Sequence, residues 1–266
     1  MLLNTFRKFK FYYFRGVNNY QIRQNVFYIR RGKSTRNKYS HILIVSNPVY
    51  VDISMVCIAS FMSANPEYLV VIHCDVKTFP YMQQAIKKLG LADFVIINCD
   101  MSKDLSWQQN KVELILSLNG SSDLFMDADL RWNGKLPDVK GITFFVKEFL
   151  FQDKSPYRQI LEVVGIDPSP QASMKNTSFF TFAGKFIEPN LVREVREEIN
   201  SFSFKVKSCN IGILDLPILE RLSEQIVISI LAEKWDDKIN FLKESDGHKD
   251  GAFVESSYFG ATGSTF

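Results

Sequence analysis

The sequence predicts an α/β protein with a mostly parallel central sheet flanked by helices. Short apolar segments rich in β-branched residues recur along the chain, and helical patterns separate them. This alternation begins only after residue 38. We therefore expect a basic aromatic arm over residues 1–38 and one folded domain over residues 39–266.

The expected elements follow one another as strand, helix, strand. Four segments are continuous apolar runs of the kind found in strands buried on both faces: His41–Ser46, Tyr68–His73, Phe94–Asn98 and Asp123–Leu130. Three helical patterns separate them: Asp52–Met62, Tyr81–Leu89 and Ser106–Leu118. Gly90 follows the second helix at a position typical of a C-terminal cap.

The arm differs from the body in charge. Residues 1–38 contain ten Lys and Arg and no acid, whereas the rest of the chain holds 22 bases and 29 acids. Aromatic residues are interleaved with the bases in the arm. Residues 6–31 could contact an anionic membrane surface, pack on the body, or bind single-stranded nucleic acid; we favour the membrane and expect no nucleic acid.

Composition argues against several classes. No run of about 20 apolar residues is present, and the first residues lack the apolar core of a secretory signal, so we expect a cytoplasmic protein, peripheral at the membrane if the arm binds lipid. The four cysteines have neither zinc-site nor disulfide-framework spacing, and we expect reduced, buried thiols.

The clearest chemical signal is the pair Asp127 and Asp129. In an extended strand, residues i and i+2 point to the same side, so both carboxylates are expected at the carboxyl end of the fourth strand. Two close carboxylates repel each other, and Mg²⁺ or Mn²⁺ bound to a substrate phosphate would remove the repulsion. Two acids in a solvated turn are the alternative.

With this order of elements and the motif Asp127-Ala128-Asp129, residues 41–255 resemble the nucleotide-sugar-dependent glycosyltransferases of the GT-A fold. The resemblance implies a nucleotide-binding half over residues 39–135 and an acceptor-binding half over residues 136–266. It implies transfer of a sugar from a nucleotide-sugar, with a UDP-sugar favoured, to a hydroxyl of a glycan or glycolipid.

The resemblance also implies roles for individual residues. Asp127 would face the ribose and the metal, Asp129 would bind the metal directly, His248 would be the third ligand, and Lys249 would meet the departing phosphate. Residues expected near the nucleotide are Val45, Ser46, Asp75 and Lys111, the last with a solvated lysine as its alternative.

The resemblance also implies an acid in this region that orients the acceptor hydroxyl or acts as general base. Glu224 would be that base in an inverting reaction, with Asp215 as the competing candidate. Glu224 follows Ser223, and the two could instead cap a helix over Ile226–Leu231. Inversion and retention remain open. The alternatives to glycosyl transfer are another metal-dependent enzyme acting on nucleotides or phosphates, such as a sugar nucleotidyltransferase, and a non-catalytic basic binding module.

Overall fold

The computed structural model describes residues 20, 22–30, 36–44, 48–132, 134–145, 147–153, 157–158, 161–162, 165–166, 169–208, 216–235, 238–242 and 254–256. The chain divides into two compact units. The first consists of Met1–Asp100, Ala128–Leu136 and Asp250–Phe266, and the second of Met101–Asp127 and Pro137–Lys249.

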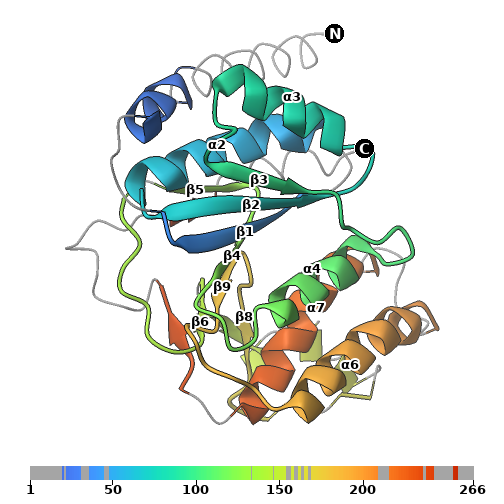
Figure 1. Cartoon of the computed structure of the whole chain (residues 1–266). Coiled ribbons are helices and arrows are strands. Elements are labelled where there is room, and N and C mark those ends of the chain that lie inside the picture. The colour runs from blue at the N-terminus through green and yellow to red at the C-terminus, as the bar shows by residue number, and fades with distance from the viewer. Residues whose placement is uncertain are drawn as a thin grey trace, which may run out of the picture. The chain divides into compact units, whose positions relative to one another are not determined.

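The first unit is built on a parallel sheet. Its strands are β1 (Lys38–Ile44), β2 (Tyr68–Cys74) and β3 (Val95–Asn98), paired in that order. Helices α2 (Pro48–Ala64) and α3 (Phe79–Leu89) connect them and lie on one face of the sheet (Figure 1). A two-stranded antiparallel pair, β5 (Leu130–Trp132) with β11 (Val254–Ser256), belongs to the same unit. The parallel sheet with its connecting helices confirms the α/β class.

Local sequence explains the boundaries of α3. The helix begins at Phe79-Pro80, where proline needs no helical hydrogen-bond partner. It ends at Gly90, whose φ of 64° and ψ of 41° are left-handed and suit glycine. Met82 and Ile86 are buried. The predicted cap at Gly90 is confirmed.

The second unit has a mixed sheet. The strands β10 (Asn240–Phe241), β6 (Thr143–Phe144), β9 (Phe179–Thr181) and β4 (Leu124–Asp127) are neighbours in that order. Strand β9 is antiparallel to both β4 and β6, and β10 is parallel to β6. A separate antiparallel pair is formed by β7 (Lys147–Leu150) and β8 (Ser173–Lys175). The short 3-10 helix η1 (Phe151–Asp153) directly follows β7.

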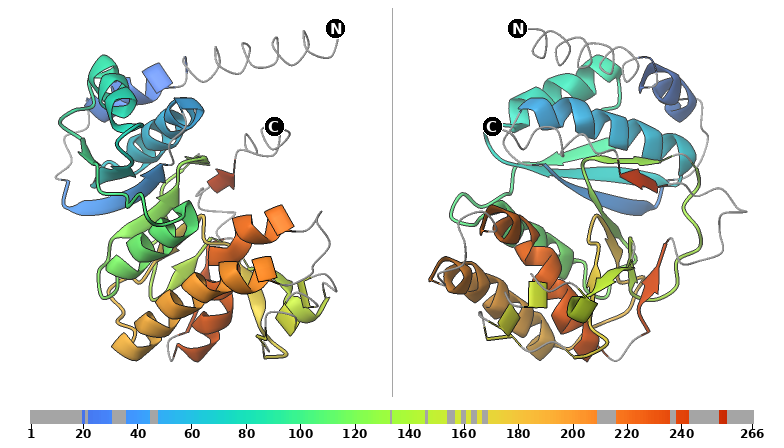
Figure 2. Two further views of the ribbon diagram at one scale, coloured as in Figure 1. Left: turned by 90° about the vertical axis from the view of Figure 1, so that its right-hand side faces the viewer. Right: turned by 180° about the vertical axis from the view of Figure 1, so that it is seen from behind.

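Helices accompany this sheet within the described residues. They are α4 (Trp107–Ser117), α6 (Pro189–Ser208) and α7 (Leu216–Leu231), and a short 3-10 helix, η2 (Ala232–Lys234), continues α7. Helices α6 and α7 pack side by side (Figure 2). Phe179, Phe180 and Phe182 are fully buried, so these aromatic side chains belong to the core.

Two predicted boundaries were wrong. Strand β4 ends at Asp127, and residues Ala128 and Asp129 form a turn, so the same-side geometry expected of an extended Asp127–Asp129 is absent. Helix α7 begins at Leu216, so Ser223 and Glu224 lie within the helix and do not cap it. Proline at its second position is tolerated because the first turn needs no donor there.

Two further observations concern the predictions from composition. Within the described residues, no helix is long and apolar enough to span a membrane. Cys57 and Cys74 are buried thiols that form no disulfide, as expected, but Cys99 is exposed, which corrects the prediction for that residue. Cys209 lies outside the described residues.

Candidate active site

The candidate site is built on Asp127, the last residue of β4. Its backbone N–H donates to the Ser178 carbonyl at 2.7 Å, just before β9 begins. Its side chain is 26 % exposed. The strand pairing therefore fixes the backbone of Asp127 while its carboxylate keeps a solvent-facing side.

Lys111 fixes the carboxylate of Asp127. A capping box formed by Ser106 and Gln109 begins α4, and Lys111 lies on the second turn of that helix. The Lys111 Nζ is 2.9 Å from Asp127 Oδ1 and 3.0 Å from Oδ2, and it lies 5.4 Å from the centre of the Phe125 ring. The lysine is 3 % exposed, which excludes the alternative of a solvated side chain.

Glu224 on α7 is the second acid in contact with Lys111. Its Oε1 lies 3.3 Å from the Lys111 Nζ, although the two residues are 113 positions apart in sequence. The side chain is 3 % exposed, and its Oε2 has no hydrogen-bond partner in the part of the chain that the structure describes. One buried ammonium is thus shared by two carboxylates.

The charges in this cluster shift two pKa values. Burial raises the pKa of Glu224 above its usual range, and repulsion from Asp127 adds to the effect against the attraction of Lys111. Burial alone would lower the pKa of Lys111, but attraction and hydrogen bonding from Asp127 and Glu224 together raise it. Lys111 is therefore cationic at neutral pH, and Glu224 takes up a proton more readily than an exposed glutamate does.

Of the other predicted site residues, the structure describes Asp129 and Asp75. Asp129 lies in the turn after β4. Asp75 follows β2, as expected, and its Oδ1 accepts a hydrogen bond from the Thr78 N–H at 2.7 Å. Five predicted residues lie outside the described residues: Val45, Ser46, Asp215, His248 and Lys249.

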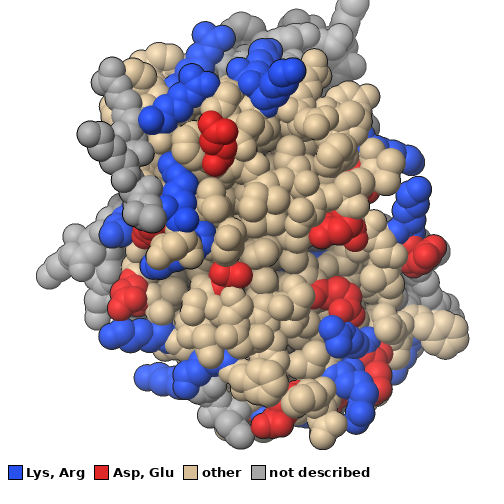
Figure 3. All heavy atoms as spheres, in the orientation of Figure 1, with Lys and Arg blue, Asp and Glu red and all other residues tan. Residues whose placement is uncertain are grey.

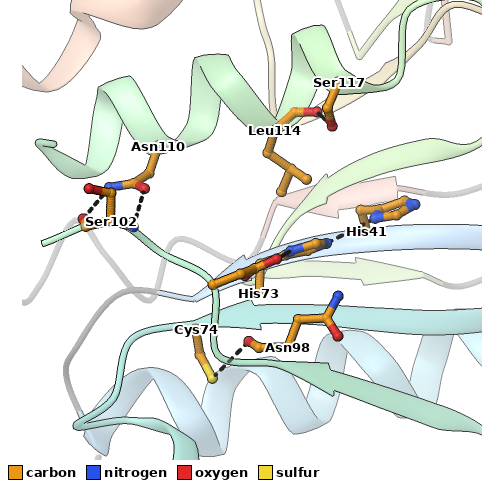
Figure 4. A network of polar contacts seen from close by, with 9 residues as sticks. His41, His73, Cys74, Asn98, Ser102, Asn110, Leu114 and Ser117 are labelled. Atoms are coloured by element: carbon orange, nitrogen blue, oxygen red, sulfur yellow. Dashed lines mark hydrogen bonds and ion pairs between the residues drawn. The ribbon is translucent and has the colours of Figure 1, made fainter.

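The first unit holds a separate polar network on its sheet. His73 Nδ1 lies 2.8 Å from Asp100 Oδ2, and its Nε2 lies 2.9 Å from His41 Nδ1 (Figure 4). Both ring nitrogens of His73 are therefore occupied by protein partners. Nowhere in the described ranges do three His, Cys, Asp or Glu side chains lie where they could hold a metal ion.

Sequence reasoning missed a second buried lysine. Lys175 on β8 is 2 % exposed, and its Nζ donates to the backbone carbonyls of Ser173 and Ser229 and to the Glu233 carboxylate. The sequence pattern does not indicate that either lysine is buried, because each contacts carboxylates that are distant in sequence. The one local signal was the position of Lys111 in the helix before the Asp127 strand.

Comparison with known proteins gave matches among solved structures only. No protein-family model and no curated protein matches this sequence. The PaToxG glycosyltransferase is 12% identical over 84% of this chain and 79% of its own, with a TM-score of 0.45.

Two further solved structures are glycosyltransferases as well. The WbbM bifunctional glycosyltransferase is 12% identical over 79% of this chain and 39% of its own, with a TM-score of 0.49. The galactosyltransferase LgtC, solved with donor and acceptor sugar analogs, is 10% identical over 76% and 72%, with a TM-score of 0.47. Glycosyltransferases are the class that the sequence resembles. Because identities and scores are this low, we infer the function from the residues of the site.

Proposed function

We propose that this chain is a metal-dependent glycosyltransferase that moves a sugar from a nucleotide-sugar, with a UDP-sugar favoured, to a hydroxyl of a glycan or glycolipid. The observation that carries the proposal is the buried Lys111, which holds Asp127 at the end of β4 while it also contacts Glu224. Asp129 follows in the next turn. A fixed carboxylate, a second acid two residues on and a buried acid nearby are the groups that such a reaction needs.

The carboxylates at the end of β4 fit a divalent metal. The Asp127 side chain is partly exposed, and a carboxylate oxygen is the kind of hard ligand that these metals prefer. Asp127 and Asp129 would hold Mn²⁺ or Mg²⁺, with His248 proposed as the third ligand. When bound, the metal would act as a Lewis acid on the leaving diphosphate.

Glu224 is proposed as the general base for an inverting reaction. Its pKa is raised by burial, and a more basic carboxylate accepts the proton of a hydroxyl more readily. Its unpartnered Oε2 suits a hydrogen bond from an acceptor hydroxyl. In that step the hydroxyl oxygen bonds to the anomeric carbon, the bond from that carbon to the phosphate oxygen breaks, and Glu224 takes the hydroxyl proton. Asp215 remains the competing candidate.

The nucleotide is proposed to contact residues from the ends of the first strands. Val45, Ser46 and Asp75 are assigned to the nucleoside, and Lys249 is assigned to the departing phosphate. The Asp75 Oδ1 accepts the Thr78 N–H at 2.7 Å, which holds this carboxylate just after the end of β2. Lys111 would act on the donor through Asp127, since its ammonium is bound to carboxylates.

The test is a thermal-shift and hydrolysis screen of nucleotide-sugars with and without Mn²⁺. We expect a UDP-sugar with Mn²⁺ to raise the melting temperature of the wild type and of Asp138→Asn, a matched change at an exposed carboxylate. We expect no such rise for Asp129→Asn. Equal responses from all three proteins would exclude the proposed metal ligand.

Product analysis separates the alternative reactions. A glycosyltransferase releases a nucleoside diphosphate, whereas a sugar nucleotidyltransferase releases or consumes pyrophosphate. Pyrophosphate as the product would replace the proposal by that alternative. An absence of both binding and turnover across the screen would favour the non-catalytic binding module.

A further inference from the structure

One helix of the first unit presents aromatic side chains to solvent. Residues 22–30 are helical, as is Tyr20. Ile22, Val26 and Ile29 are at most 8 % exposed, and their spacing of four and three residues places them on one face. This face is part of the core of the unit.

The opposite face of this helix carries large aromatic side chains that are exposed to solvent. Tyr20 is 64 % exposed, Phe27 49 % and Tyr28 64 %. Tyr20 and Phe27 are seven residues apart and share the outward side, with the exposed Arg23 between them. Phe27 and Tyr28 contact each other edge to face, with ring centres 5.8 Å apart.

Contacts with α3 fix which way this aromatic face points. The Arg30 guanidinium donates to the carbonyls of Leu89 and Gly90, each at 3.3 Å. A Cβ placed on Gly90 would lie 1.5 Å from the Arg30 Nη2, so the close approach depends on glycine. With Ile22, Val26 and Ile29 buried on the other side, the aromatic face cannot turn inward.

Exposed bases lie next to this face, together with the exposed Asp93 in the turn after α3. Lys87 and Lys88 are exposed in the last turn of α3, the helix that Arg30 contacts. Helix α3 contains no acid, and the first acid of the chain is Asp52. Lys and Arg side chains gather at the top of the face in view (Figure 3), where α3 lies in Figure 1. We define the docking face as Tyr20, Arg23, Phe27 and Tyr28 together with Lys87 and Lys88.

We propose that the docking face lies on a membrane surface of anionic phospholipids. Aromatic rings with polar edges favour the interface between lipid and water, and each base near anionic headgroups adds attraction. A convex helix with rings set edge to face suits a flat lipid surface. Single-stranded nucleic acid instead needs a groove in which successive bases stack on ring faces. The proposal does not depend on glycosyl transfer.

The experiment is co-sedimentation of the full chain with lipid vesicles. One set contains phosphatidylcholine alone, and the other contains phosphatidylcholine and phosphatidylglycerol in roughly a three-to-one ratio. Two triple variants probe the face: Tyr20→Ser with Phe27→Ser and Tyr28→Ser, and Arg23→Gln with Lys87→Gln and Lys88→Gln. The matched control is Phe186→Ser with Phe204→Ser, since both rings are exposed, at 61 % and 74 %, in the second unit.

We expect the wild type and the control to bind the anionic vesicles and not to bind the neutral ones. The charge variant should bind about 100-fold more weakly, because three bases are lost, and added salt should weaken the wild type in the same direction. The aromatic variant should bind the anionic vesicles at least about 10-fold more weakly than the wild type. Circular dichroism and urea unfolding check that each variant is folded.

Three outcomes would overturn the proposal. One is an aromatic variant that binds within about twofold of the wild type. Another is loss of vesicle binding on deletion of residues 1–19 with both triple variants unaffected, which would place the contact in the arm. The third is binding of a single-stranded oligonucleotide, lost in the same variants, without any binding to vesicles.

Discussion

Replacing Lys111 by methionine should destabilise the protein strongly. Methionine has nearly the length of the lysine stem but no ammonium, so Asp127 and Glu224 would lose the cation between them. Glu224 would then be a buried carboxylate beside an apolar side chain. Such an uncompensated charge costs far more than an exposed one.

The distances give the size of the effect. At separations of 2.9 Å and 3.3 Å, an effective dielectric constant of about 20 gives a gross attraction of about 5 kcal/mol for each pair. Desolvation of the three groups offsets much of it. Because removal of one partner leaves the others buried, we expect Lys111→Met to lose about 3 to 5 kcal/mol of unfolding free energy.

Urea unfolding at neutral pH measures the loss, and Lys175→Met is the matched control. Lys175 is equally buried and also contacts a carboxylate, so its replacement should destabilise the protein as well. Of the two variants, Lys111→Met alone should abolish the response to a nucleotide-sugar with Mn²⁺, because Lys111 contacts Asp127 whereas Lys175 contacts Glu233. A loss under about 1 kcal/mol for Lys111→Met would refute the buried ion cluster.

The pH dependence of folding stability tests the same cluster in the variant Glu224→Gln. The folded pKa of Glu224 is raised above its unfolded value, so its protonation favours the folded state. This contribution is fully present below about pH 4.3 and is lost as the pH rises through the folded pKa. Glu224→Gln should therefore flatten the decline of stability above that pH, and an unchanged slope would contradict the raised pKa.

Two further predictions concern the first unit. Gly90→Ala should lower the unfolding free energy by about 1 to 2 kcal/mol, because alanine is strained at φ 64° and its Cβ would collide with Arg30; thermal unfolding with no change would contradict this. Burial, with nearby Cys99 and acidic groups, raises the pKa of Cys74 to about 12, so a thiol reagent at pH 8 should modify the exposed Cys99 first and Cys74 only on unfolding. Mass spectrometry of the modified peptides reads out the order.

The sequence predicted the elements whose causes are local. Strands β1 to β3 were evident because buried parallel strands are continuous apolar runs, and α4 because its apolar residues recur at helical spacing. The wrong boundaries have local causes too. The chain turns after Asp127 although its residues suit a strand, and α7 starts at Leu216, seven residues before the possible cap at Ser223.

The site was predicted in part. Asp127 was selected by its place at the end of an apolar strand, whereas the roles of Glu224 and Lys111 were implied by the resemblance to a known family. The contact that unites them could not be predicted, because Lys111 is 16 residues from Asp127 and 113 from Glu224. Packing of α4 against α7 and β4 decides it, and no periodicity in the sequence encodes that packing.

The two buried lysines differ in a way that bears on function. Lys175 donates to two backbone carbonyls as well as to Glu233. An apolar side chain in its place would leave these buried acceptors without the hydrogen bonds that Lys175 donates. The hydrogen-bond partners of the Lys111 ammonium among the described residues are two carboxylates. Apolar residues of similar size in place of such an ion cluster are often neutral or stabilising. Stability therefore accounts for Lys175, whereas the Lys111 cluster is better explained by the need to hold the Asp127 carboxylate at the end of β4.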